Sequence, residues 1–144
     1  MWARQATPRR GCSSAPEPVD RELAREVGQE GHRPAAGKHY QQAVALAPAT
    51  GAYANNYGTW LCGNGRAAES LDWFEKAIAD PNYPTRAAAL ANAGTCANRA
   101  GQPEQAEANW RQALALDPGE LQSLAGMAAL QFARGRYLEA RAFA

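Results

Sequence analysis

A helical pattern of small and apolar residues, repeated along the chain, most limits what this sequence can fold into. In residues 51–81 these residues form two groups at spacings of three and four: Tyr57, Gly58 and Leu61, then Ser70, Phe74 and Ala77. Such spacings place each group on one face of a helix. Because Gly65-Arg66 interrupts the pattern, we predict two short antiparallel helices joined by a tight turn. Small residues let the two backbones approach, while Leu61 and Phe74 fill the seam.

The pattern recurs along the chain at offsets of 34, 36 and 34 residues, with the two extra residues at Tyr83-Pro84. The equivalent residues are Ala36, Tyr40, Ala43 and Pro48, then Gly94, Ala106, Trp110, Ala113 and Pro118, and finally Met127, Gly135 and Ala140. This period and these residue types are typical of the tetratricopeptide repeat, whose helix pairs bury their apolar faces only by stacking. We therefore predict an all-α fold, a tetratricopeptide-repeat solenoid of antiparallel helix pairs with about three and a half repeats.

The repeats are placed at residues 17–50, 51–86, 87–120 and 121–144, the last one incomplete, within a repeat domain at 20–144. Residues 1–19 are rich in Arg and Pro and have no periodic apolar face, so we predict a disordered or altered N-terminal segment. Gly11-Cys12-Ser13-Ser14 is similar to the end of a bacterial lipoprotein signal, which makes Cys12 a candidate for lipidation. Arg9 and Arg10 stand where such a signal needs apolar residues, so we expect a defect at this end.

Several classes of function are disfavoured by composition and spacing. The formal net charge is only +1, and no clustered basic footprint for nucleic acid is present. No apolar run is long enough to span a membrane. His32 and His39 lack ligand-spaced neighbours and are interpreted as surface residues rather than a metal site. No Ser, Cys or Thr has a neighbouring residue placed to act as its general base. Glu104 and Glu107 are interpreted as solvated charges. We predict a protein that is not an enzyme and uses no cofactor or small-molecule substrate.

The binding hypothesis rests on polar residues of the first helices, which line the concave face of such a stack. The candidate partner-binding residues are Asn55, Asn56, Thr59, Asn92, Thr95 and Asn98. Asn56 and Asn92 share a register position, and an amide offers both a donor and an acceptor to a peptide backbone. The alternative is that these side chains satisfy local helix or turn groups of their own chain.

Aromatic residues suggest a second surface. Trp110 occupies the seam position and is predicted to lie in the core, and Tyr83 can lie across the joint between repeats. Trp60 and Trp73 fall off the seam, so they either pack between repeats or form an exposed patch for a partner. We favour packing between repeats for both.

The chain has three cysteines, and two of them sit late in consecutive first helices. Neighbouring first helices pack side by side, so Cys62 and Cys96 could approach to bonding distance. The alternative is two small buried apolar residues, which is how free cysteine usually behaves. A Cα separation above about 7 Å would exclude the disulfide.

Three blocks of sequence go beyond a generic repeat: residues 55–62 (NNYGTWLC), 79–85 (ADPNYPT) and 92–96 (NAGTC). Together they resemble the type IV pilus biogenesis/stability protein family of tetratricopeptide lipoproteins, also called pilotins, from about His32 to the end of the chain. The resemblance implies a periplasmic adaptor anchored to the outer membrane, which helps the pilus secretin to localise there and form its multimer. It also implies a role in twitching motility. It favours a Cys62–Cys96 disulfide, since periplasmic cysteines are free to oxidise.

Two other hypotheses remain from the sequence. The chain departs from the family pattern in its Arg-containing start and in its smaller number of repeats. One hypothesis is therefore that it is a degraded copy without function. The other is a cytosolic tetratricopeptide scaffold or chaperone adaptor with reduced thiols and a basic groove for the carboxylate tail of a partner. Only Arg21 and Arg25 are expected near that groove.

Overall fold

The computed structural model describes residues 34–144 of the chain, and the fold is discussed for these residues. They form α2 (Pro34–Leu46), α3 (Gly51–Gly63), α4 (Ala67–Ala79), α5 (Arg86–Arg99), α6 (Pro103–Leu116), α7 (Leu121–Ala133) and α8 (Tyr137–Phe143). Several predictions fall outside this range: the character of residues 1–19, the first helix of repeat one, and the roles of Cys12, Arg21, Arg25 and His32.

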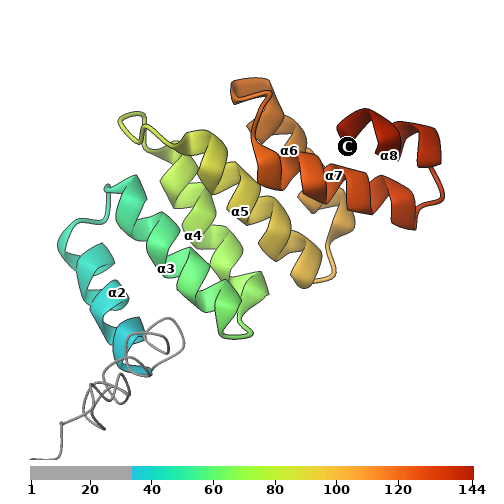
Figure 1. Cartoon of the computed structure of the whole chain (residues 1–144). Coiled ribbons are helices and arrows are strands. Elements are labelled where there is room, and N and C mark those ends of the chain that lie inside the picture. The colour runs from blue at the N-terminus through green and yellow to red at the C-terminus, as the bar shows by residue number, and fades with distance from the viewer. Residues whose placement is uncertain (1–33) are drawn as a thin grey trace, which may run out of the picture. The chain divides into compact units, whose positions relative to one another are not determined.

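The described helices form successive hairpins, α3 with α4, α5 with α6 and α7 with α8, and α2 packs on α3 (Figure 1). No strand occurs between Pro34 and Ala144. Each second helix also packs on the first helix of the next hairpin, so that α4 contacts α5 and α6 contacts α7. This confirms the predicted all-α tetratricopeptide-repeat solenoid.

The seam within each hairpin is formed by the residues that the periodicity selected. Leu61 and Phe74 are both fully buried. Gly58 is needed at their contact, because a Cβ there would lie 3.1 Å from the Phe74 ring and 3.2 Å from the backbone oxygen of Ser70. In the next hairpin Trp110 is buried at the equivalent position, and its Nε1 donates to the backbone oxygen of Ala91 at 3.3 Å. The predicted core position of Trp110 is confirmed.

Glycine ends the first helix of each hairpin. Gly65, Gly101 and Gly135 have φ angles of 81°, 76° and 72°, the left-handed region that side chains with a Cβ rarely enter. These are the only residues with positive φ in the described chain. The left-handed residue reverses the chain within a few residues, so the second helix starts close to where the first one ended.

The joint between the second and third repeats is built on Asp80. Its carboxylate accepts hydrogen bonds from the backbone nitrogens of Gly51 at 2.8 Å and Asn82 at 2.9 Å. These two bonds hold the pKa of the Asp80 carboxyl below its usual value. Tyr83 packs against a buried cluster of alanines from α3, α4 and α5, so it lies across the joint as predicted. The Asp80 carboxylate therefore ties the start of α3 to the segment that follows α4.

Trp60 and Trp73 pack around the buried Tyr57, together with Tyr40 and Val44 of α2. The rings of Tyr57 and Trp60 are stacked with centroids 6.0 Å apart, and Trp73 meets Tyr57 edge-on at 4.8 Å. Both tryptophans are partly buried. Trp60 lies against α2, because a Cβ on Gly37 would be 2.4 Å from its ring. Trp73 packs on two buried clusters, one with residues of α2 and α3 and the other with residues of α3, α4 and α5. Both tryptophans thus belong to clusters that span repeats, in agreement with the favoured alternative.

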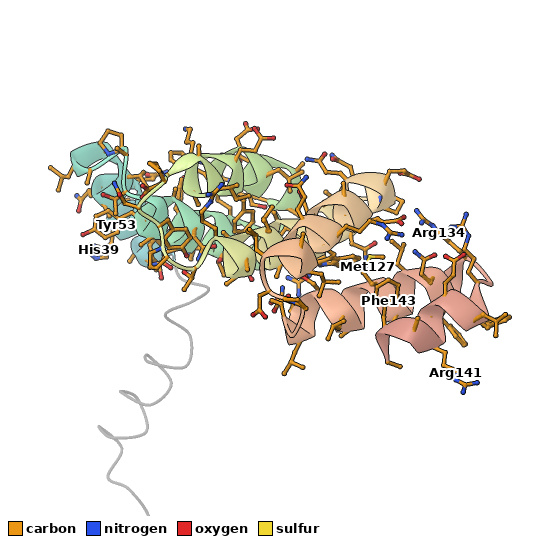
Figure 2. The ribbon with its side chains drawn as sticks, turned by 90° about the horizontal axis from the view of Figure 1, so that it is seen from above. His39, Tyr53, Met127, Arg134, Arg141 and Phe143 are labelled. Atoms are coloured by element: carbon orange, nitrogen blue, oxygen red, sulfur yellow. A yellow bond between two sulfur atoms is a disulfide. The ribbon has the colours of Figure 1, made fainter. Side chains whose placement is uncertain are left out.

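The last hairpin is held by polar as well as apolar contacts. Met127 and Phe143, both labelled in Figure 2, pack in the largest core cluster. Arg134, the residue that follows α7, donates to the Glu107 carboxylate on α6, which also pairs with Arg111 at 2.7 Å. Hydrogen bonding from Arg134, and then from Arg111, holds the pKa of Glu107 below its usual value. Glu107 is thus an inter-helix ion-pair partner rather than the freely solvated charge expected from its spacing.

Candidate functional site

The first helices lie side by side, with α3 against α5 and α5 against α7. A cavity of about 200 Å³ opens between them, and we call it the α5 groove. Its lining residues come from all three helices: Thr59, Cys62 and Gly63 of α3, Asn92, Thr95, Cys96 and Arg99 of α5, and Gln122 of α7. Of the six predicted binding residues, Thr59, Asn92 and Thr95 line the groove. Asn55 lies beside it, and Asn56 and Asn98 are exposed outside the lining.

The asparagines make a bridge between repeats. Asn92 Nδ2 donates to Asn55 Oδ1 at 3.2 Å, which connects α5 to α3. The sequence pattern paired Asn92 with Asn56 by register, whereas the structure pairs it with the preceding residue. This bridge uses one of the two Nδ2 protons of Asn92. The second Nδ2 proton and Oδ1 of Asn92 take no part in it.

The threonines are engaged with their own helices. Thr59 Oγ1 donates to the backbone oxygen of Asn55 at 2.9 Å, and Thr95 Oγ1 donates to that of Ala91 at 3.2 Å. These bonds to the backbone of the same helix agree with the alternative interpretation of the two threonines, in which they satisfy groups of their own chain. Both hydroxyls retain oxygen lone pairs, so toward a ligand they act as acceptors.

Gln122 was not identified from the sequence, yet it forms the α7 wall of the groove. Its Nε2 donates to Thr95 Oγ1 at 2.8 Å and to the backbone oxygen of Ala91 at 3.3 Å. The available signal was its place in the first turn of α7, the first helix of the fourth repeat. Glu120 caps that helix by accepting from the backbone nitrogens of Gln122 and Ser123.

Arg99 is the second residue that sequence reasoning missed. It lies in the last turn of α5, its side chain is exposed, and its Nη1 lies 3.8 Å from Cys62 Sγ. No described carboxylate forms an ion pair with it, whereas Arg66, Arg111, Arg134 and Arg136 are all paired. Its spacing of seven residues from Asn92 and four from Thr95 was the signal that could have placed it on the groove face.

Cys62 and Cys96 are joined by a disulfide that forms part of the groove wall. Their Cα atoms are 5.9 Å apart, within the range that a disulfide spans. The bond links α3 to α5, so it fixes the separation of two walls of the groove.

Other kinds of site find little support within residues 34–144. No group of His, Cys, Asp or Glu in this range could hold a metal ion. In the same range, no helix has the length and apolar character needed to cross a bilayer. A larger hollow of about 700 Å³ lies between the start of α5 and the α6–α7 loop. Its lining combines apolar residues such as Leu116 and Leu121 with the charged residues Arg86, Asp117 and Glu120.

The hairpin stack and the polar groove along its first helices define a tetratricopeptide-repeat scaffold for protein–protein interaction. The tetratricopeptide repeat family model matches residues 49–119. Stacked repeats of this kind provide extended binding surfaces for other proteins.

This chain is similar to solved structures that include PilW and pilF. PilW is described as a widely conserved type IV pilus biogenesis factor; it is 36% identical with a TM-score of 0.68, over 74% of this chain and 49% of that one. The pilF protein of Pseudomonas aeruginosa is 26% identical with a TM-score of 0.69, over 74% of this chain and 48% of that one. This chain spans about half the length of each. No curated protein sequence matches it. The similarity to type IV pilus biogenesis proteins thus extends from three blocks of sequence to the fold.

Proposed function

We propose that this protein is a non-catalytic adaptor in type IV pilus biogenesis, which assists the pilus secretin in reaching the outer membrane and forming its multimer. The observation that carries the proposal is the shared fold and 36% identity with PilW, itself described as a type IV pilus biogenesis factor. The secretin is the proposed partner, bound as an extended segment along the first helices, and twitching motility is the proposed physiological output.

The cysteine pair supports a periplasmic location within this proposal. Disulfides persist in the periplasm and are rare in the cytosol, and Cys62 and Cys96 are bonded across two repeats. Anchoring to the outer membrane through Cys12 belongs to the same proposal, and this residue lies outside the described range.

The second candidate is a general tetratricopeptide scaffold or chaperone adaptor that binds a peptide in the same groove. The exposed, cationic Arg99 within the polar lining favours it, because such a group suits an acidic partner of many kinds. This candidate predicts peptide binding without any effect on secretin assembly, so one experiment separates the two.

The test is complementation in a bacterium that lacks its pilotin. The chain is expressed behind a working lipoprotein signal, and detergent-resistant secretin multimers are measured by blotting. The control joins the same signal to an unrelated soluble domain, and fractionation verifies that both proteins are exported at equal abundance. Restored multimers support the proposal. Monomeric secretin beside folded, exported protein rejects it, and the general scaffold or a degraded copy then becomes the leading explanation.

A further inference from the structure

Helix α5 presents three polar side chains along its wall of the α5 groove. Asn92, Thr95 and Arg99 follow one another at spacings of three and four, which places them on one face. From the first to the last, the helix rises about 10 Å, the length of roughly three residues of extended peptide. About three residues of an extended segment lying along α5 would therefore span the distance from the amide of Asn92 to the guanidinium of Arg99.

The groove offers unused hydrogen-bonding groups of both kinds. Gln122 uses its amide nitrogen on Thr95 and Ala91, and its Oε1 accepts no hydrogen bond from the described chain. Asn92 has used one amide proton on Asn55, and its Oδ1 is likewise not engaged by the described residues. Peptide N–H and C=O groups match these acceptors and the remaining donor whatever the peptide sequence is.

Arg99 supplies the only charge in the lining formed by the described residues, and no carboxylate lines the groove in that part of the chain. Its contact with Cys62 is to a disulfide sulfur at 3.8 Å, a weak acceptor. The planar guanidinium fork is suited to a carboxylate, which it binds through two parallel hydrogen bonds.

The carboxylate of a side chain fits this groove better than that of a chain end. Capture of a terminal carboxylate commonly uses clusters of free backbone N–H groups. Between Thr59 and Cys62 and between Asn92 and Arg99 the walls are helical, so their N–H groups are engaged within the helices. The disulfide holds α3 at a set distance from α5, so the groove is formed before the ligand arrives.

We propose that the α5 groove recognises an extended peptide segment through an internal Asp or Glu side chain that pairs with Arg99, while Asn92 and Gln122 bind the peptide backbone. This inference rests on the proposed function, because it assumes that the partner lies along the first helices. It adds the chemistry of the segment that is recognised, which the similarity to PilW does not supply.

The probe is a pair of short, N-acetylated, C-amidated peptide libraries with either Glu or Gln fixed at the centre, since capped ends remove terminal charges. Peptides retained by the full oxidised chain are sequenced, and the dissociation constants of the best binders are measured by fluorescence anisotropy. We expect enrichment from the Glu library, and a loss of about tenfold or more when that Glu is changed to Gln. Because Arg99 is exposed, this discrimination should weaken as salt is raised.

Variants assign the effect to Arg99. In Arg99→Gln the Glu and Gln peptides should bind equally, and Arg99→Lys should restore only part of the preference because Lys lacks the fork. Arg141→Gln is the matched control: Arg141 is exposed, lies on α8 away from the groove, and forms no ion pair with the described residues (Figure 2). It should discriminate between the peptides as the wild type does. Circular dichroism and thermal melting verify that each variant is folded.

Three outcomes would overturn the inference. The first is peptide binding without preference for Glu, or with a preference that survives Arg99→Gln. The second is affinity that appears only when the peptide carries a free C-terminal carboxylate. The third is no retained peptide from either library. None of these decides the proposed function, which stands or falls on the secretin-multimer assay.

Discussion

Trp110 lies where three helices meet, and its ring leaves no room for a side chain on two neighbouring glycines. A Cβ at Gly94 would lie 2.5 Å from Trp110 Cδ1 and Nε1, and a Cβ at Gly126 would lie 2.5 Å from Cε2 and Cζ2. An ordinary Cβ contact begins at 3.4 Å, so the ring would have to retreat by nearly an ångström. We predict that Gly94→Ala destabilises the protein, although alanine is the better helix former.

The magnitude follows from three contributions. Replacing glycine by alanine within a helix gains up to about 1 kcal/mol. Overpacking a buried contact costs about 1–3 kcal/mol, and the ring is only 3% exposed, so it has no open side toward which it can move. Displacing Trp110 also weakens its bond to the backbone oxygen of Ala91, worth about 1 kcal/mol. The net loss of unfolding free energy should therefore be about 1–3 kcal/mol.

The assay is urea unfolding of the full chain, followed by far-UV circular dichroism and by tryptophan fluorescence. Gly63→Ala is the matched control, because it is also a helical glycine and nothing lies within 4 Å of its added Cβ. This control should be neutral or stabilising by up to about 1 kcal/mol. A Gly94→Ala protein as stable as the wild type would refute the packing argument.

A double-mutant cycle isolates the contact itself. The second repeat has Phe74 where the third has Trp110, and there a Cβ on the facing Gly58 would be 3.1 Å from the ring. In a Trp110→Phe background the cost of Gly94→Ala should therefore fall, and the two changes should couple by about 1 kcal/mol or more. Strict additivity would mean that the clash with the indole is not the cause.

Three further predictions concern the joints and turns. Reducing the Cys62–Cys96 bond, which closes a loop with a sequence separation of 34 residues, should lower the unfolding free energy by about 3–4 kcal/mol; the urea midpoint should shift with reductant in the wild type and not in a Cys62→Ser/Cys96→Ser variant. The lowered pKa of Glu107 means that its ion pairs stabilise the fold above the ordinary glutamate pKa and lose this effect as pH falls through the lowered value. Glu107→Gln should accordingly be less stable at neutral pH and less sensitive to acid, and parallel acid melts of the two proteins would contradict this. Gly101→Ala should cost about 1–2 kcal/mol because of its positive φ, with Gly101→Asn costing less in the same melting assay.

Local chemistry made the hairpins predictable. Spacings of three and four selected Leu61, Phe74 and Trp110 as the seam, and all three are buried. Small residues marked the close approach of the helices, and Gly65 between the two apolar groups marked the turn. These properties depend on residues within one hairpin, where the helical period fixes which side chains share a face.

The α5 groove was only partly predictable. Thr59, Asn92 and Thr95 were expected on it and line it, while Gln122 and Arg99 were missed. Each first helix has several polar residues on the same face, and the sequence does not indicate which of them will contact a neighbouring helix.

The sequence by itself determined the repeating helix pair, its seam and its turns, because these follow from side-chain spacing within about 34 residues. Only the tertiary structure decided the axial position of each first helix relative to the next one. The repeats containing α3 and α5 are offset by 36 residues, yet Asn55 meets Asn92 at a separation of 37 and Cys62 meets Cys96 at a separation of 34. The offset between two repeats identifies residues at equivalent positions, and these need not be the residues that are in contact. The axial stagger that brings side chains together is set by packing between hairpins, and that packing places Arg99 and Gln122 in one groove.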